Sequence, residues 1–318
     1  MGRATSGRNG QGSGRHQRWT DLAVVGGIVG LGYMVVLATI DGGWMEGAPA
    51  FSVLTLPAAG FLAWRTAMPW RRVLLGTAIF GGAFGFFFEM FQESGQSYSV
   101  VATSLPKLLG VVPGDSVVAH MCMTLLTLTF YEHFVLQREP ANAAAATADL
   151  SARARYGIGL GTTMVVAVVV AHLIEPSWVD IGYSYAVLGT AAILPPVLLA
   201  LKRPAWLRNL TLVVPVFFAS YVVMEVVAVR HDWWIYPADH YLGWVTLPGP
   251  VSDVRFPFEE LFYWMAFYAA ALTSYYEIFL VPATSNALVT PSHDRRLPSA
   301  GSREKGPPHA ITEELAGR

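Results

Sequence analysis

Residues 208–229 indicate the fold class of this chain. Their sequence is RNLTLVVPVFFASYVVMEVVAV, and it contains a single acid, Glu225. About 20 predominantly apolar residues are enough for a helix to span the hydrocarbon core of a bilayer. Seven more apolar runs of similar length occur in the chain, at residues 22–40, 49–68, 73–91, 116–136, 156–174, 184–201 and 258–281. We therefore predict an all-α integral membrane protein with about eight transmembrane helices.

The composition supports this class and excludes several others. Of the 318 residues, 53% are hydrophobic and 14% are charged, and the mean hydropathy is +0.43. A soluble domain has about 25% charged residues. The chain has 21 basic and 22 acidic residues, so its net charge is close to zero and we expect no nucleic-acid partner. The single cysteine, Cys122, excludes a disulfide framework, and we expect neither a metal nor an organic cofactor. We expect the helices of this protein to contact the lipid bilayer.

The basic residues predict the orientation of the spans. Both tails and every second loop carry most of the lysine and arginine, whereas the opposite loops carry only Lys107, Arg230 and Arg255. This bias predicts a multi-pass protein of the cell membrane with both termini cytoplasmic. The expected divisions are a disordered tail at 1–18, four helices at 19–138, a cytoplasmic linker at 139–155, four helices at 156–283, and a disordered tail at 284–318.

The two sets of four helices are predicted to be an internal repeat. Each half has an acid at three equivalent positions near the non-cytoplasmic ends of its spans. The pairs are Asp41 with Glu175, Glu89 with Glu225, and Asp115 with Glu259, separated by 134, 136 and 144 residues. With an even number of spans in each half, the repeats are parallel and related by an axis along the membrane normal. The six acids are therefore expected to converge on one face of the bundle.

Two neighbouring acids near the end of the second half are both candidates for the residue that points into the pocket. Glu259 and Glu260 lie about 100° apart on a helix, so only one of them is expected to face a given point. The repeat favours Glu259, because its counterpart is Asp115, whereas Glu260 corresponds to Ser116. Glu260 is then expected to orient its neighbour or to pair with Arg255.

Acids and aromatic residues at the edge of an apolar cavity indicate acid chemistry on a hydrocarbon. A buried carboxyl group can stay protonated near neutral pH and act as an acid, and aromatic faces stabilise a nearby positive charge. Such a site can protonate an olefin and shelter the carbocation, which is terpenoid cyclisation or hydration. A small-molecule transporter would use similar acids, although no span looks broken at its midpoint. A scaffold for other terpenoid enzymes is a third alternative.

The motif pattern resembles the lycopene cyclase domain of carotenoid biosynthesis. The second half carries it best and the first half more weakly. The matching residues are Glu225, Trp234-x-Tyr236, Tyr241-x-Gly243 and Pro257-x-Glu259-Glu260, and in the first half Glu89, Tyr98, Leu109-Gly110 and Pro113-Gly114-Asp115. Two departures from the family are Ser116, which stands where a second acid would be, and the larger number of spans.

The resemblance implies a carotenoid substrate and a redox-neutral ring closure. Glu259 would protonate a linear ψ-end, Glu225 or Asp115 would remove a proton, and the product would carry an ionone ring. The cation would be lined by Trp234, Tyr236 and Trp264. The carotenoid hydratase-type membrane family is the second choice, because Glu89, Gly95, Tyr98 and the stretch 109–113 match its pattern as well. Cyclisation of another terpenoid in the membrane is a further alternative for the reaction. Other carotenoid enzymes are an alternative for the partners.

Residues outside this pattern have simpler interpretations. His120 in the fourth run is either a proton relay or a packed core histidine. Glu132, His133 and Glu277 fall at the cytoplasmic ends, where we expect solvated side chains at headgroup level. The glycines within 26–32 and 81–85 are expected to allow close helix packing.

Overall fold

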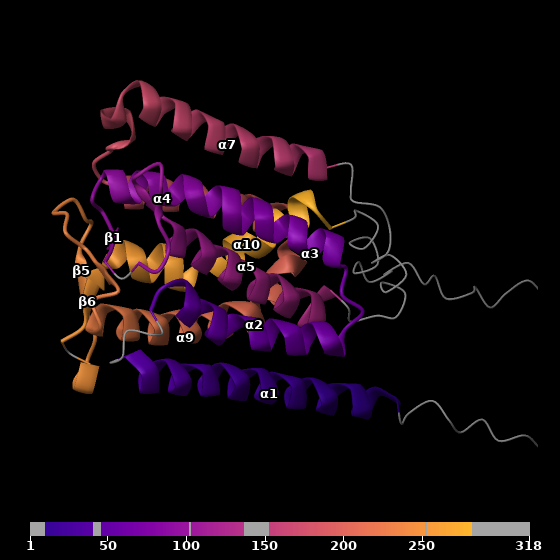
Figure 1. Ribbon diagram of the computed structural model, residues 1–318. Coiled ribbons are helices and arrows are strands. Elements are labelled where there is room, and N and C mark those ends of the chain that lie inside the picture. Colours follow the sequence, from indigo (N-terminus) through magenta and orange to yellow (C-terminus); the bar gives the residue numbers. More distant parts are fainter. Residues whose placement is uncertain (1–9, 41–45, 102, 137–152, 252, 282–318) are drawn as a thin grey trace, which may run out of the picture.

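The computed structural model describes residues 10–40, 46–101, 103–136, 153–251 and 253–281. Long helices run side by side, and the short strands gather at one end of the bundle (Figure 1). Helices form over every predicted apolar run, so the all-α prediction is confirmed. Their bounds are α1 Gly10–Thr39, α2 Ala48–Arg65, α3 Trp70–Gly76, α4 Phe84–Ser94, α5 Gly114–Phe134, α7 Ala154–Ile174, α8 Ser184–Lys202, α9 Leu207–Arg230 and α10 Tyr268–Phe279.

Two π-helical segments join these helices. The segment η2 (Thr77–Ala83) links α3 to α4, and η7 (Glu260–Ala266) precedes α10. A π-helix is rare and is frequently found at functional sites. The remaining short helices are 3₁₀ turns, namely η4 Pro176–Val179, η5 Pro204–Trp206 and η6 Gly249–Val251.

The helices fit a membrane protein. Within the described residues, five segments are long and apolar enough to cross a bilayer, namely Gln17–Thr39, Trp70–Ser94, Ala154–Ile174, Ser184–Lys202 and Pro204–Arg230. Large apolar side chains are also exposed on the outside, with Trp64 at 78%, Leu201 at 74% and Leu173 at 69%. Exposed apolar surface of this extent marks a face that contacts lipid or another apolar partner. That all eight apolar runs span the membrane stays a prediction.

Several expected segments differ from the structure or lie outside it. Helix α1 begins at Gly10, within the tail expected at 1–18, because its backbone hydrogen bonds continue from the apolar part into the polar residues. Asp41, residues 137–152 and residues 282–318 lie outside the described residues. The acid expected at Asp41, most of the expected linker and the C-terminal tail are therefore not placed.

The short strands were not predicted, and they build the end of the bundle where the acids were expected to gather. Three antiparallel pairs form there among the described residues. They are β1 (Ser99–Val100) with β4 (Trp234–Ile235), β2 (Lys107–Leu108) with β3 (Val112–Pro113), and β5 (Trp244–Thr246) with β6 (Arg255–Pro257). The first pair ties a loop of the first half to a loop of the second half.

The acids expected to be solvated at the other end are buried, so that expectation is wrong. Glu132 is 0% exposed and Glu277 is 3% exposed. The hydroxyl of Tyr276 donates to Glu132 at 2.5 Å, and the hydroxyl of Tyr131 donates to Glu277 at 2.7 Å. A buried carboxylate is tolerated where hydrogen bonds and an opposite charge compensate it. Arg72 supplies that charge, since its Nη2 lies 2.6 Å from Glu132.

Close packing of η2 on α5 depends on Gly81. A Cβ atom there would lie 2.8 Å from the Cα of Met121, whereas a Cβ at Gly82 would meet only the side chain of Met121 at 3.8 Å. Overpacking of this kind costs about 1–3 kcal/mol. We expect Gly81→Ala to lower the midpoint of denaturant unfolding in detergent clearly, and Gly82→Ala to leave it nearly unchanged. Equal midpoints for the two variants would contradict this account of the contact.

Candidate active site

Four acids predicted from the sequence line one cavity of about 120 Å³ at the strand end of the bundle. They are Glu89 in the middle of α4, Asp115 at the start of α5, Glu225 in the last turns of α9, and Glu260 at the start of η7. The cavity is also lined by the predicted aromatic residues Tyr98, Trp234 and Trp264. Acids up to 171 positions apart in the chain therefore line one cavity, as expected for acids placed near the same ends of their helices.

Glu225 is held by two residues of the loop that follows its helix. The hydroxyl of Tyr236 donates to Glu225 Oε1 at 2.7 Å, and the indole N–H of Trp234 approaches the same oxygen at 3.3 Å. Tyr236 is absent from the residues that line the cavity. Its role in the structure is to orient Glu225, whereas Trp234 both contacts Glu225 and lines the cavity.

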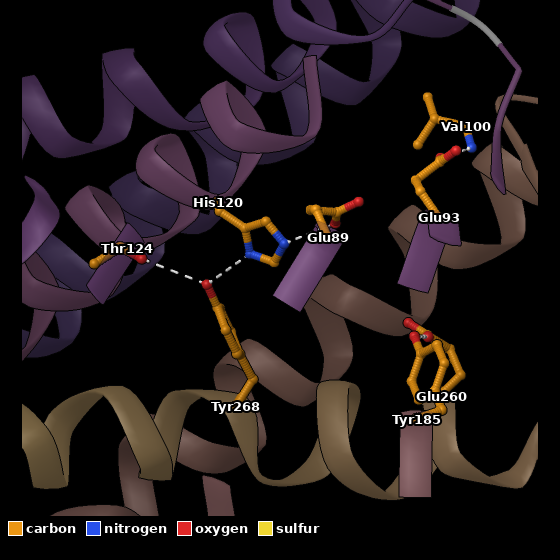
Figure 2. Close-up of polar contacts among 8 residues, drawn as sticks. All are labelled: Glu89, Glu93, Val100, His120, Thr124, Tyr185, Glu260 and Tyr268. Carbon is orange, nitrogen blue, oxygen red and sulfur yellow. Dashed lines mark hydrogen bonds and ion pairs between the residues drawn. The ribbon is translucent and has the colours of Figure 1, made fainter. Parts of the chain in front are cut away.

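Glu89 forms a chain of polar contacts with His120 and Tyr268 (Figure 2). His120 Nε2 lies 3.0 Å from Glu89 Oε1, and His120 Nδ1 lies 3.1 Å from the hydroxyl of Tyr268. The second oxygen of Glu89, Oε2, is buried and has no hydrogen-bond partner among the described residues. Buried polar atoms are nearly always paired, so an unpaired carboxylate oxygen at a cavity wall is available to a ligand or a water molecule.

Glu260 is hydrogen-bonded by the hydroxyl of Tyr185 on α8 (Figure 2). The Tyr98 hydroxyl interacts electrostatically with Glu89, Glu260 and Glu225. Burial, and then the negative charges of these acids, raise the pKa of the Tyr98 hydroxyl well above its ordinary value. The Tyr98 hydroxyl therefore stays protonated.

The structure places Glu260, rather than Glu259, at the cavity, which differs from the sequence expectation. Glu259 is fully buried but is absent from the lining, and its Oε1 accepts a hydrogen bond from the backbone N–H of Leu242 at 2.6 Å. Glu259 would face the cavity only in a regular α-helix that followed an exact repeat. Since a π-helix begins at Glu260, the spacing of side chains around the axis changes there. The expected partner of Glu260, Arg255, lies over the ring of Trp244 at 4.4 Å.

Asp115 lines the cavity, but its oxygens hold a loop. It accepts hydrogen bonds from the backbone of Ala48, Ser104 and Leu105, and from the hydroxyl of Ser104. Asp115 precedes the apolar part of α5. Burial raises the pKa of its carboxyl group, but the hydrogen bonds that it accepts outweigh burial and leave the pKa below its ordinary value. Asp115 is therefore an ionised anchor of the loop, as Glu259 anchors the backbone at Leu242.

Aromatic rings form the walls around the acids. The ring of Trp264 lies 5.0 Å from that of His120 and 4.8 Å from that of Tyr268, measured between centroids. On the other side, Tyr98 lies 5.9 Å from Trp234. Pro257 is not part of these walls, because it pairs with Trp244 in the hairpin of β5 and β6.

Sequence reasoning missed several polar residues of the site. Tyr185, Gln92 and Tyr268 line the cavity, but each lies in an apolar run with no motif around it. His120 is a candidate from the sequence, but the sequence does not indicate its hydrogen-bond partners. Only the packing of α4, α5, α8 and α10 shows that these side chains meet the acids.

The charge balance of the site favours acid chemistry. Among the described residues that line the cavity, none is lysine or arginine, and His120 is the sole basic side chain. Charges buried without compensation are costly, and here three glutamate carboxyl groups share one cavity with a single histidine. Several carboxyl groups in one cavity can serve as proton donor and proton acceptor, the two roles that general acid and general base catalysis require.

Comparison of the chain with protein-family models, with curated proteins and with solved structures gave no match. The function must therefore be inferred from the geometry of the site itself.

Proposed function

We propose that this chain is a membrane enzyme that carries out redox-neutral acid chemistry on a carbon–carbon double bond of an apolar isoprenoid. The leading reaction is closure of the linear end of a carotenoid into a six-membered ring, of lycopene cyclase type. One observation carries the proposal. Glu89, Glu225 and Glu260 meet in a cavity without lysine or arginine among its described lining residues, and its walls are aromatic. These are the groups needed to deliver a proton and to shelter a carbocation.

The proposed steps conserve atoms and electrons. Glu260 transfers its proton to the terminal double bond, which leaves a tertiary cation on the substrate. A second double bond of the same chain attacks this cation, closes the ring and moves the positive charge into it. Glu89 Oε2, the unpaired oxygen, removes a proton from the ring and leaves a double bond. For the next turnover, Glu89 loses this proton and Glu260 is protonated again.

Hydration of the same double bond is the second candidate, because the cavity has polar atoms suited to a water molecule. Gln92 and Glu89 both line the cavity, and their atoms Gln92 Oε1 and Glu89 Oε2 are buried and have no hydrogen-bond partner among the described residues. A buried water typically makes about three hydrogen bonds to such atoms. Water held there would capture the first cation before the ring closes.

The internal duplication is part of the proposal, and three features support it. Tyr131-Glu132 and Tyr276-Glu277 exchange hydrogen bonds reciprocally, each tyrosine donating to the glutamate of the other half. Strands β1 and β4 follow α4 and α9 at corresponding places and pair with each other. A short hairpin then precedes α5 in one half and η7 in the other. Eight spans and a cytoplasmic position for both termini belong to the same proposal.

The test is expression of the chain in cells that accumulate lycopene, with the pigments separated by chromatography and weighed by mass spectrometry. Cyclisation predicts a product of unchanged mass with a shifted absorption spectrum. A gain of one or two waters would assign hydration instead. Unaltered lycopene in cells that contain the folded protein would count against both carotenoid reactions and favour transport or another terpenoid.

A further inference from the structure

A groove of about 500 Å³ lies at the strand end of the bundle, apart from the acid cavity. Its walls come from the end of α4, from the hairpin of β2 and β3, from the end of α7 and from the turn η4 with the residue that follows it. Among the described residues, the groove and the acid cavity share no lining residue. The groove is therefore a site of its own, built between the two halves of the chain.

The groove lies at the level where two apolar segments end. Of the segments long and apolar enough to cross a bilayer, one ends at Ser94 and another at Ile174. Ser94 lines the groove, and so does His172, two residues before the second segment ends. Apolar side chains beside the groove residues are exposed, with Leu173 at 69% and Trp178 at 58%. Because tryptophan is enriched at the membrane–water interface, the groove lies at the depth of lipid headgroups.

Both signs of charge line this groove. Nζ of Lys107 lies 3.1 Å from Oε2 of Glu93, whose side chain is only 5% exposed, so a buried carboxylate holds the lysine at the wall. An ammonium group has three N–H donors, and Lys107 can therefore also bind an anionic group in the groove. The Asp180 carboxylate is exposed and has no hydrogen-bond partner among the described residues. A ligand with one negative and one positive group is complementary to these walls.

The walls favour a primary ammonium as the positive group of the ligand. Quaternary ammonium groups are recognised by aromatic cages, and none of the described lining residues is Phe, Tyr or Trp. A primary ammonium donates hydrogen bonds, and the carboxylate of Asp180 and the hydroxyls of Ser94 and Ser177 can accept them. A purely anionic headgroup would instead meet the carboxylates of Glu93 and Asp180, with Lys107 as the sole lysine or arginine among the described lining residues.

We propose that this groove binds the phosphoethanolamine headgroup of a phospholipid. The phosphate lies at Lys107 and the ammonium at Asp180, and the acyl chains follow the exposed apolar residues at the end of α7. This binding does not require the proposed reaction, so either can hold without the other.

Competition between lipids tests the ammonium subsite. The purified chain in detergent is offered equal amounts of phosphatidylethanolamine, phosphatidylcholine and phosphatidylglycerol with the same acyl chains, and bound lipid is measured by native mass spectrometry. We expect the wild type to retain phosphatidylethanolamine at least fivefold over each of the others. Asp180→Asn is expected to reduce this preference at least threefold. Asp239→Asn is the matched control, because Asp239 is 91% exposed in the loop between β4 and β5 and does not line the groove. It is expected to leave the preference unchanged.

A second variant tests the phosphate subsite. Lys107→Gln is expected to lower retention of all three lipids at least threefold without changing the preference among them, because each carries a phosphate. Lys202→Gln, on an exposed residue at the end of α8, is its control and is expected to have no effect.

Three outcomes would overturn the headgroup site. They are equal retention of the three lipids by the wild type, an unchanged preference in Asp180→Asn, and unchanged retention in Lys107→Gln. Displacement of the bound lipid by an equal concentration of soluble O-phosphoethanolamine would overturn the lipid as the source of the ligand, since a headgroup without acyl chains would then suffice.

Discussion

Replacement of Glu260 by glutamine is expected to reduce product formation in lycopene-accumulating cells at least 100-fold. General acid catalysis contributes about 10²–10⁴ to a rate, and glutamine has no proton to give at neutral pH. Glutamine keeps an oxygen that can accept from Tyr185, so the fold is expected to survive. The measurement is the amount of cyclised or hydrated pigment, normalised to the amount of protein extracted from the membrane.

The matched control is the neighbouring acid. Glu259→Gln keeps an Oε1 atom that can accept from the backbone of Leu242, and Glu259 is absent from the cavity lining. We expect this variant to retain product formation within about threefold, since it removes no proton donor from the cavity. The reverse order of effects would show that the acid suggested by the sequence repeat, Glu259, delivers the proton.

The largest expected effect on stability is at Arg72, at the opposite end of the bundle. Arg72 Nη2 lies 2.6 Å from Glu132, and its Nε donates to the hydroxyl of Tyr276 at 3.0 Å. Arg72→Leu leaves the Glu132 carboxylate buried without its cation, which typically costs about 3–5 kcal/mol. We expect a large fall in the denaturation midpoint of the detergent-solubilised protein.

Two further variants test the cause of that loss. Arg71 is the preceding residue and is exposed, so Arg71→Leu is expected to leave the midpoint nearly unchanged. Adding Glu132→Leu to Arg72→Leu removes the uncompensated charge and is expected to restore part of the lost stability. A double variant no more stable than Arg72→Leu would show that packing around Arg72, rather than charge, carries the effect.

The structure also shows where sequence reasoning about a site fails. Glu89, Asp115, Glu225 and Glu260 were all predicted from sequence, and all line the cavity, because acids at the same ends of apolar helices have to meet near one face. Their individual roles were not predictable in this way. Whether an acid faces a ligand or a backbone N–H depends on the helix turn around it, and the turn at Glu260 is a π-helix.

The sequence by itself determined the helices of this protein, since an apolar run of about 20 residues is helical wherever its backbone groups lack water. It also determined which acids and aromatic residues share the strand end of the bundle. Only the tertiary structure decided which of them contact one another. His120 lies 31 residues from Glu89 and 148 residues from Tyr268, and all three meet because α4 and α10 both pack against α5. Such contacts depend on side-chain packing between helices, and no local pattern in the chain encodes them.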